Sequence, residues 1–161
     1  MTGNAATWAE FEQADGELAQ LIMARLGSHR HAIMATLKAD GSPRTSGMEA
    51  PIRSGHLWLA MGPESRKAAD LGRDPRFSLH SAPDDEQLPD GDARIDGMAQ
   101  PADTAQQAEF VAGHRYPIDD PSTMALFVAM ITRVVLVRVS GDSLLIDSWT
   151  PATGRDTHRI Q

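Results

Sequence analysis

Three polar side chains stand together in the segment GPESRKAADL (62–71), where a helix is predicted to follow a strand: Ser65, Arg66 and Lys67. The start of a helix presents free backbone N–H groups and the positive end of the helix dipole. A hydroxyl donor, an arginine fork and a lysine charge at that place form a phosphate site in physical terms. The alternative is a solvated basic turn beside the acidic Glu64 and Asp70. Both interpretations stay open on the residues alone.

The elements around this segment are predicted to be mostly antiparallel strands. Apolar residues alternate before and after two turn signals, Asp40-Gly41 and Ser54-Gly55, which favour hairpins because glycine supplies a positive φ. Three strands joined by two tight turns form a meander. The complete prediction is seven strands, over 32–38, 44–52, 56–61, 76–81, 93–100, 131–139 and 144–149.

Helices are predicted in four places. Apolar residues recur at helical spacing over 6–26, where Gly16 weakens the middle and leaves open a division into two pieces. A short helix is predicted from Pro63 to Gly72. Asp103 and Gln106 form a capping box for a helix over 104–112, and the apolar stretch 122–130 is predicted to be helical. Strands outnumber helices, so the fold class is mainly β (α+β), a closed or partly closed antiparallel barrel with peripheral helices.

Bulk properties limit the classes of function. The 161 residues suit one domain, 1–161, with an N-terminal helical segment over 1–28 and a polar C-terminal tail over 150–161. The net charge of −7 disfavours nucleic-acid binding, and no apolar run approaches the roughly 20 residues of a membrane helix. There is no cysteine, and residues 1–14 lack the pattern of a secretory signal. These features predict a cytoplasmic protein with no membrane partner.

The chain resembles a known superfamily in several separate motifs. They are ATLKADGSPR (35–44), LWL (57–59), SRKA (65–68) and RDPR (73–76). In these motifs the chain is similar to the pyridoxamine-phosphate-oxidase-like, FMN-binding split β-barrel superfamily, and within it to the actinobacterial flavin/deazaflavin oxidoreductase branch. The resemblance covers about 30–100 well, and the last hairpin fits the closing strands of the family. It implies an antiparallel split β-barrel.

The resemblance also implies which residues bind the cofactor. The strand after the DGSP turn would lie along the flavin ring and ribityl chain, and the end of the third strand would run past the cofactor. The serine and the two cations after it would hold the phosphate. In the phosphate-oxidase subgroup, a tryptophan and arginines near the C-terminus complete the site. The residues concerned here are Arg44, Thr45, Ser46, Ala60, Met61, Ser65, Arg66, Lys67, Trp149, Arg155 and Arg159.

The function that the resemblance implies is that of a flavin- or deazaflavin-dependent oxidoreductase, which transfers a hydride to or from a small conjugated substrate. The implied cofactor is FMN, with the deazaflavin coenzyme F-420 as the alternative, in a site at the interface of a homodimer. Met48 and Met61 would supply an apolar wall against water. A non-catalytic flavin, deazaflavin or haem carrier, and a dimer with an empty site, remain open alternatives.

Some residues depart from this pattern or carry weaker signals. The segment Met48-Glu49-Ala50 stands where the vitamin-oxidase subgroup has a phosphate-binding lysine, so oxidation of pyridoxamine phosphate itself is not predicted. His29 and His31 are spaced like metal ligands but lack a third partner. His80 is the candidate ligand if the chain binds haem. The acidic stretch 84–86 is predicted to be a solvated loop.

Overall fold

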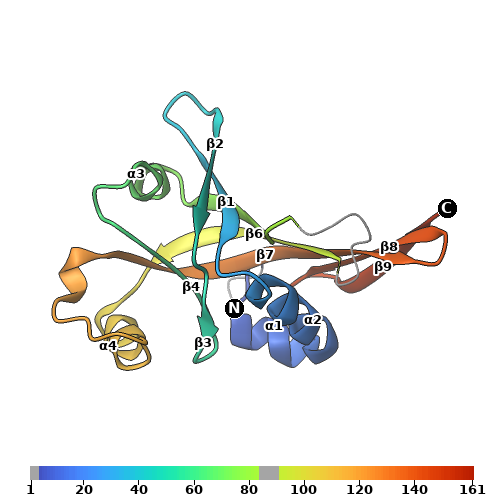
Figure 1. Ribbon diagram of the computed structural model, residues 1–161, viewed down its shortest axis with the longest axis horizontal. Coiled ribbons are helices and arrows are strands. Elements are labelled where there is room, and N and C mark those ends of the chain that lie inside the picture. The colour runs from blue at the N-terminus through green and yellow to red at the C-terminus, as the bar shows by residue number, and fades with distance from the viewer. Residues whose placement is uncertain (1–3, 84–90) are drawn as a thin grey trace.

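One antiparallel sheet dominates the molecule (Figure 1). The computed structural model describes residues 4–83 and 91–161, which leaves the predicted acidic loop at 84–86 outside the described residues. In the described part, nine strands pair in the order β2-β1-β5-β6-β7-β4-β3, with β8 and β9 added beside β7. Their bounds are β1 Ala32–Leu37, β2 Pro43–Met48, β3 Ile52–Arg53, β4 His56–Met61, β5 Arg76–His80, β6 Asp92–Pro101, β7 Ala125–Ser140, β8 Ser143–Thr150 and β9 Gly154–Ile160.

The longest strand, β7, divides the sheet into two parts. It has 16 residues, of which 127–137 lie against β6 along one edge. Along the other edge, 125–128 pair with β4 and 134–140 pair with β8. Between them, Ile131 exchanges two backbone hydrogen bonds of 2.7 and 2.9 Å with Ala6. The sheet is therefore not closed, and the predicted mainly β fold, an antiparallel split β-barrel with peripheral helices, is confirmed.

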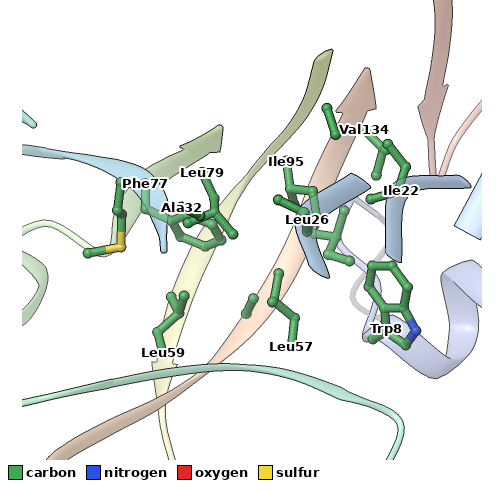
Figure 2. Packing of buried hydrophobic residues seen from close by; sticks show 14 of the residues in the cluster. Trp8, Ile22, Leu26, Ala32, Leu57, Leu59, Phe77, Leu79, Ile95 and Val134 are labelled. Atoms are coloured by element: carbon green, nitrogen blue, oxygen red, sulfur yellow. The ribbon is translucent and has the colours of Figure 1, made fainter. Parts of the chain in front are cut away.

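Two helices near the N-terminus cover the opening between the two parts of the sheet. They are α1 Trp8–Ala14 and α2 Gly16–Gly27, so the predicted helix over 6–26 is divided at Asp15. Asp15 causes the division because its side chain accepts a hydrogen bond from Leu18 N and caps α2. The apolar faces of both helices pack on the sheet. Figure 2 shows Trp8, Ile22 and Leu26 beside Leu57, Ile95 and Val134, all of them buried.

Three sequence predictions are corrected by the sheet. The predicted strand over 44–52 is two strands, because β2 pairs with β1 while β3 pairs with β4. The predicted helix over 122–130 is a short 3₁₀ helix, Pro121–Thr123, followed by the first half of β7, whose backbone hydrogen bonds go to β4 and β6. The predicted polar tail contains β9, which pairs with β8 along its whole length.

The remaining helices lie beside the sheet. They are α3 Arg66–Arg73, which follows β4, and α4 Thr104–Ala112, which follows β6. The capping box predicted for α4 is present, since Asp103 and Gln106 each accept a backbone hydrogen bond from the other. In the described part, no helix is long and apolar enough to cross a bilayer.

Candidate cofactor site

The predicted phosphate segment forms the junction between β4 and α3. Ser65 is the N-cap of the helix, and its Oγ accepts a hydrogen bond from Ala68 N at 3.3 Å. The helix begins at Arg66 rather than at Pro63, because Ser65 has the extended backbone of a cap. The Oγ that caps the helix still carries a hydroxyl hydrogen, so Ser65 retains a donor for a ligand.

The two cations of this segment differ in their surroundings. Arg66 is exposed and makes no ion pair with any described residue. Lys67 is half-buried, and its Nζ donates to the backbone carbonyl of Gly47 on β2 at 3.1 Å. This bond holds the first turn of α3 against the second strand, next to the residues predicted to line the cofactor.

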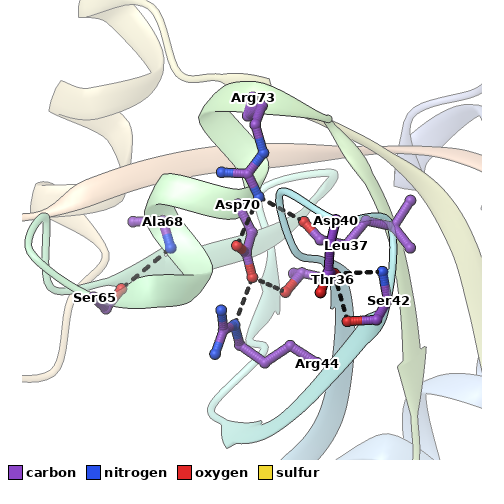
Figure 3. A network of polar contacts seen from close by, with 9 residues as sticks. All are labelled: Thr36, Leu37, Asp40, Ser42, Arg44, Ser65, Ala68, Asp70 and Arg73. Atoms are coloured by element: carbon purple, nitrogen blue, oxygen red, sulfur yellow. Dashed lines mark hydrogen bonds and ion pairs between the residues drawn. The ribbon is translucent and has the colours of Figure 1, made fainter.

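A buried carboxylate joins the same helix to the same strand further along (Figure 3). Asp70 accepts hydrogen bonds from Arg44 Nε at 2.6 Å, Thr36 Oγ1 at 2.8 Å and Arg73 Nη2 at 2.9 Å. Arg73 also donates to the carbonyl of Leu37 at 2.9 Å. The network therefore ties α3 to both β1 and β2.

The Arg44 guanidinium is the main cause of a strongly lowered pKa for Asp70. Hydrogen bonds from Arg73 and Thr36 lower this pKa further, while burial of the carboxyl opposes them. Asp70 is therefore ionised throughout the neutral range. The cluster formed by Arg44, Arg66, Lys67, Arg73 and Asp70 keeps a clear excess of positive charge.

The three predicted residues of β2 do not share one face. Arg44 and Ser46 stand opposite Thr36 and Met34 of β1, on the inner face of the sheet. Thr45 alternates with them and is exposed on the outer face. Ser46 Oγ is buried and has no hydrogen-bond partner in the described part of the chain. That orphaned hydroxyl lies on the same face of β2 as Arg44, beside the helix that carries the two cations.

The last two residues of β4 face two different apolar clusters. Met61 is buried in the main core, and Met48, the other residue of the predicted apolar wall, is buried there too. Ala60 is half-buried and packs against a second apolar cluster. That cluster is formed by Trp58, Ala102, Phe110 and Val128, with Ile118, Met124 and Leu126 packed against it.

The predicted C-terminal contributors lie away from this junction within one chain. Trp149 is buried, and its ring is 4.7 Å from that of Phe11. Arg155 donates from Nε to Asp15 at 2.6 Å, and this pairing raises the pKa of Arg155 and lowers that of Asp15. In Figure 1 the strands that carry these residues, β8 and β9, lie at the opposite end of the long axis from α3. Arg159 on β9 is exposed.

Three residues of the junction are not among the predicted site residues: Thr36, Asp70 and Arg73. The spacing of Asp70 and Arg73 is a helical i, i+3 ion pair, which is visible in the sequence. The bonds of Asp70 to Arg44 and Thr36 span 26 and 34 residues, and only the fold brings these groups together.

The donor set at this junction fits a phosphate ester. Arg44, Arg66 and Lys67 supply three positive charges, and the helix that begins at Arg66 after the Ser65 cap supplies the free N–H groups of its first turn. The orphaned Ser46 Oγ adds a buried polar atom that needs a partner. The three cations, the Ser65 hydroxyl and the helix N–H groups match the charge and the hydrogen-bond acceptors of an FMN phosphate, and the Ser46 hydroxyl remains for another part of the ligand.

Other candidate sites carry less chemistry. Among the described residues, no group of three or more His, Asp or Glu side chains is arranged to hold a metal ion. His29 lines a cavity of about 350 Å³ between the end of α2 and the segment after β2, where Arg30 pairs with Glu49 at 2.7 Å. His80 is half-buried on β5, with Nδ1 2.8 Å from the carbonyl of Ser81.

Solved structures share this fold. A haem-binding protein from Mycobacterium smegmatis is 28% identical, with a TM-score of 0.59. The match covers 81% of this chain, which spans 57% of the length of that protein. PhzG from Burkholderia lata 383, solved with tetrahydrophenazine-1-carboxylic acid, has a TM-score of 0.71 at 12% identity, with 94% and 92% of the two chains covered.

A pyridoxamine 5'-phosphate oxidase-related, FMN-binding protein from Nostoc punctiforme is also similar. It has a TM-score of 0.62 at 15% identity, with 91% of this chain and 96% of that chain covered. Comparison with curated proteins gives no match.

The family comparison agrees with the fold. The family model for pyridoxamine 5'-phosphate oxidase matches residues 18–139, a range that runs from α2 through β7 and contains the whole phosphate junction. The chain therefore belongs to the pyridoxamine 5'-phosphate oxidase family.

Proposed function

We propose that this protein binds FMN and acts as a flavin-dependent oxidoreductase on a small conjugated substrate. The observation that carries the proposal is the cationic junction of α3 and β2, where Arg44, Arg66 and Lys67 meet the start of a helix capped by Ser65. A bound flavin supplies hydride transfer at its ring. The chain supplies binding, orientation and charge.

In this proposal the residues have separate roles. Arg66 and Lys67 bind the phosphate together with Ser65 and the backbone N–H groups of the first helical turn. Arg44 contacts the phosphate from β2. Ser46 donates to the ribityl chain, and Ala60 contacts the edge of the ring, beside the second apolar cluster where a flat substrate would lie. No side chain is assigned as a proton donor.

The proposal includes a homodimer. Within one chain Trp149 packs on Phe11 and Arg155 pairs with Asp15, so the proposal takes the C-terminal contributors, Arg159 among them, from a second copy. The proposal also places the protein in the cytoplasm, since a chain without cysteine needs no oxidising compartment.

The test is the absorption spectrum of the purified protein, followed by titration with FMN and coenzyme F-420. We expect a yellow protein that releases FMN on denaturation, or a colourless one that binds added FMN more tightly than riboflavin. Tight binding of coenzyme F-420 with no affinity for FMN would identify the cofactor as a deazaflavin rather than a flavin. Binding of neither compound would contradict the proposal.

Haem binding without turnover is the second candidate. Two observations favour it: the 28% identity to the mycobacterial haem-binding protein, and the half-buried imidazole of His80 on β5. A Soret band that appears on addition of haem and is lost in His80→Ala would support this alternative. The same spectrum in both proteins would exclude His80 as the ligand.

A further inference from the structure

We propose that Asp70 is a positioning residue of the phosphate site, which it does not itself touch. It holds Arg44 by Nε and thereby leaves both Nη groups of Arg44 for the phosphate. This inference rests on the proposed FMN function and assigns to the site a carboxylate that the resemblance to the family does not include.

The two oxygens of Asp70 divide their bonds between different partners. Oδ2 accepts from Arg44 Nε at 2.6 Å and from Thr36 Oγ1 at 2.8 Å, and Oδ1 accepts from Arg73. Arg44 is therefore held at one nitrogen only. Its Nη1 and Nη2 make no hydrogen bond to any described residue. Two parallel N–H donors remain, which is the geometry for bidentate binding of a phosphate.

Arg44 also points in a direction that suits this role. Figure 3 shows its guanidinium below Asp70, pointing away from the Asp40–Ser42 turn and on the side where Ser65 begins the helix. The Arg44 side chain is 23% exposed, whereas that of Asp70 is 4% exposed. A ligand can therefore reach the arginine but not the carboxylate that holds it.

Arg73 offsets the negative charge of Asp70. A carboxylate beside a phosphate site would cancel the charge of Arg44 and repel the ligand. Arg73 pairs with the other oxygen of Asp70, and its second bond goes to Leu37 O on β1. The charges of Asp70 and Arg73 cancel, so Arg44 keeps a full positive charge for the phosphate. The three side chains together orient a cation without neutralising it.

The experiment compares FMN with riboflavin, which differ only in the phosphate. Affinities are measured by fluorescence quenching for the wild type, Asp70→Asn, Arg44→Ala and the double variant. We expect Asp70→Asn to weaken FMN binding by about tenfold and to leave riboflavin affinity unchanged, because one charge-assisted hydrogen bond orients the arginine. In the Arg44→Ala background, Asp70→Asn should cause no further loss.

The matched control is Asp74→Asn. Asp74 is the C-cap of the same helix and also pairs with an arginine, Arg76, but neither side chain makes a hydrogen bond to β1 or β2 in the described part of the chain. The FMN affinity of Asp74→Asn should equal that of the wild type.

A second variant tests the inference if Asp70→Asn does not fold. Thr36→Val removes one bond to Asp70 without changing charge, and should weaken FMN binding roughly two- to fivefold while riboflavin binding stays the same.

The outcomes separate the two proposals. Equal losses for FMN and riboflavin would make Asp70 a purely structural residue and overturn the inference. Unchanged or tighter FMN binding in Asp70→Asn and Thr36→Val would overturn it as well, and leave the FMN function standing. A wild-type protein that does not bind FMN would overturn the proposed function and this inference together.

Discussion

Arg66 gives the most direct test of the phosphate site at the scale of single residues. It is exposed and has no ion-pair partner in the described part of the chain, so its removal leaves no buried group unpaired. A charge-assisted hydrogen bond contributes about 1.5–3 kcal/mol. Arg66→Ala should therefore weaken FMN binding roughly ten- to a hundredfold with little change in folding stability.

Two further measurements complete the test of Arg66. The affinity of the wild type for FMN should fall as salt rises, because the contact joins a cation to an anion, and this dependence should be smaller in Arg66→Ala. Arg115→Ala, a change at another exposed arginine far along the chain, is the control and should bind FMN as the wild type does. Identical FMN affinities in Arg66→Ala and the wild type would identify the segment as a solvated helix start.

Asp70 also predicts how stability depends on pH. Its pKa in the folded state is far below the value of about 3.9 in an unfolded chain, mainly because of Arg44. A depressed folded pKa contributes stability that is present above the unfolded pKa and is lost as the pH falls toward the folded pKa. At neutral pH, Asp70→Asn should lower the free energy of unfolding by at most about 3 kcal/mol, since the arginines are partly exposed.

The measurement is urea denaturation of the wild type and Asp70→Asn at a series of pH values. The difference between their free energies of unfolding should be constant above about pH 5 and shrink below about pH 4. A difference that stays constant down to about pH 3 would show that Asp70 gains nothing from being ionised in the folded protein.

The sequence predicts part of the site at this scale. Ser65, Arg66 and Lys67 follow one another, so their common place at a helix start needs no long-range information. Asp70 is different. In the sequence it is a neighbouring acid of a basic turn, and its partners Thr36 and Arg44 are brought to it by the pairing of β1 with β2 and by the packing of α3.

At the scale of elements, the bulge between β6 and β7, where Thr132 of β7 has no partner on β6, depends on one glycine. The register between β6 and β7 shifts between Asp96 and Gly97. A Cβ at position 97 would lie 2.4 Å from the carbonyl oxygen of Met130 and 3.0 Å from ring carbons of Phe77. Neither the strand backbone nor a buried ring can move away easily. Gly97→Ala should therefore destabilise the protein by about 1–3 kcal/mol.

The control for Gly97→Ala is a second glycine on a strand. A Cβ added at Gly47 on β2 would meet nothing within 4 Å, so Gly47→Ala should leave the free energy of unfolding nearly unchanged. Thermal unfolding of both variants gives the comparison. Equal melting temperatures would mean that β6 and β7 adjust to the extra methyl group.

The elements that the sequence does not predict share a physical cause. Residues 125–130 form an apolar run that is buried in the middle of the sheet, and such a run carries no period that separates a strand from a helix. Pairing with β4 and β6 decides the matter. The strand β9 is missed for a different reason. Its residues are polar and mostly exposed, so the sequence lacks the apolar alternation that predicts a strand. Strands bounded by clear turns, such as β1 and β4, are predicted well.

At the scale of the whole molecule, two of the apolar regions exposed in the described part of the chain are candidates for the interface of the proposed homodimer. One lies on the outer face of the sheet, where Ile33 is 38% exposed, opposite Gly47 of β2 and beside His80 of β5. The other lies at the tip of the last strands, where Ile160 is 52% exposed. The outer face also carries the exposed Thr45 of β2, the strand whose Arg44 and Ser46 face the proposed site on the inner side, so a second copy seated there would contact the strand that lines the cofactor.

The two regions differ in what a charge placed there should do to assembly. The wild type should sediment as a dimer at micromolar concentration, since an interface that completes a site buries a large area. Ile33→Asp places a charge inside that interface and should give a monomer with weakened FMN binding. Ile160→Asp makes the same change at the other exposed apolar region and should remain a dimer.

If Ile160→Asp gives the monomer and Ile33→Asp does not, then the interface lies at the tip of β9 rather than across the outer face. A wild type that sediments as a monomer would leave Trp149, Arg155 and Arg159 without a route to the cofactor.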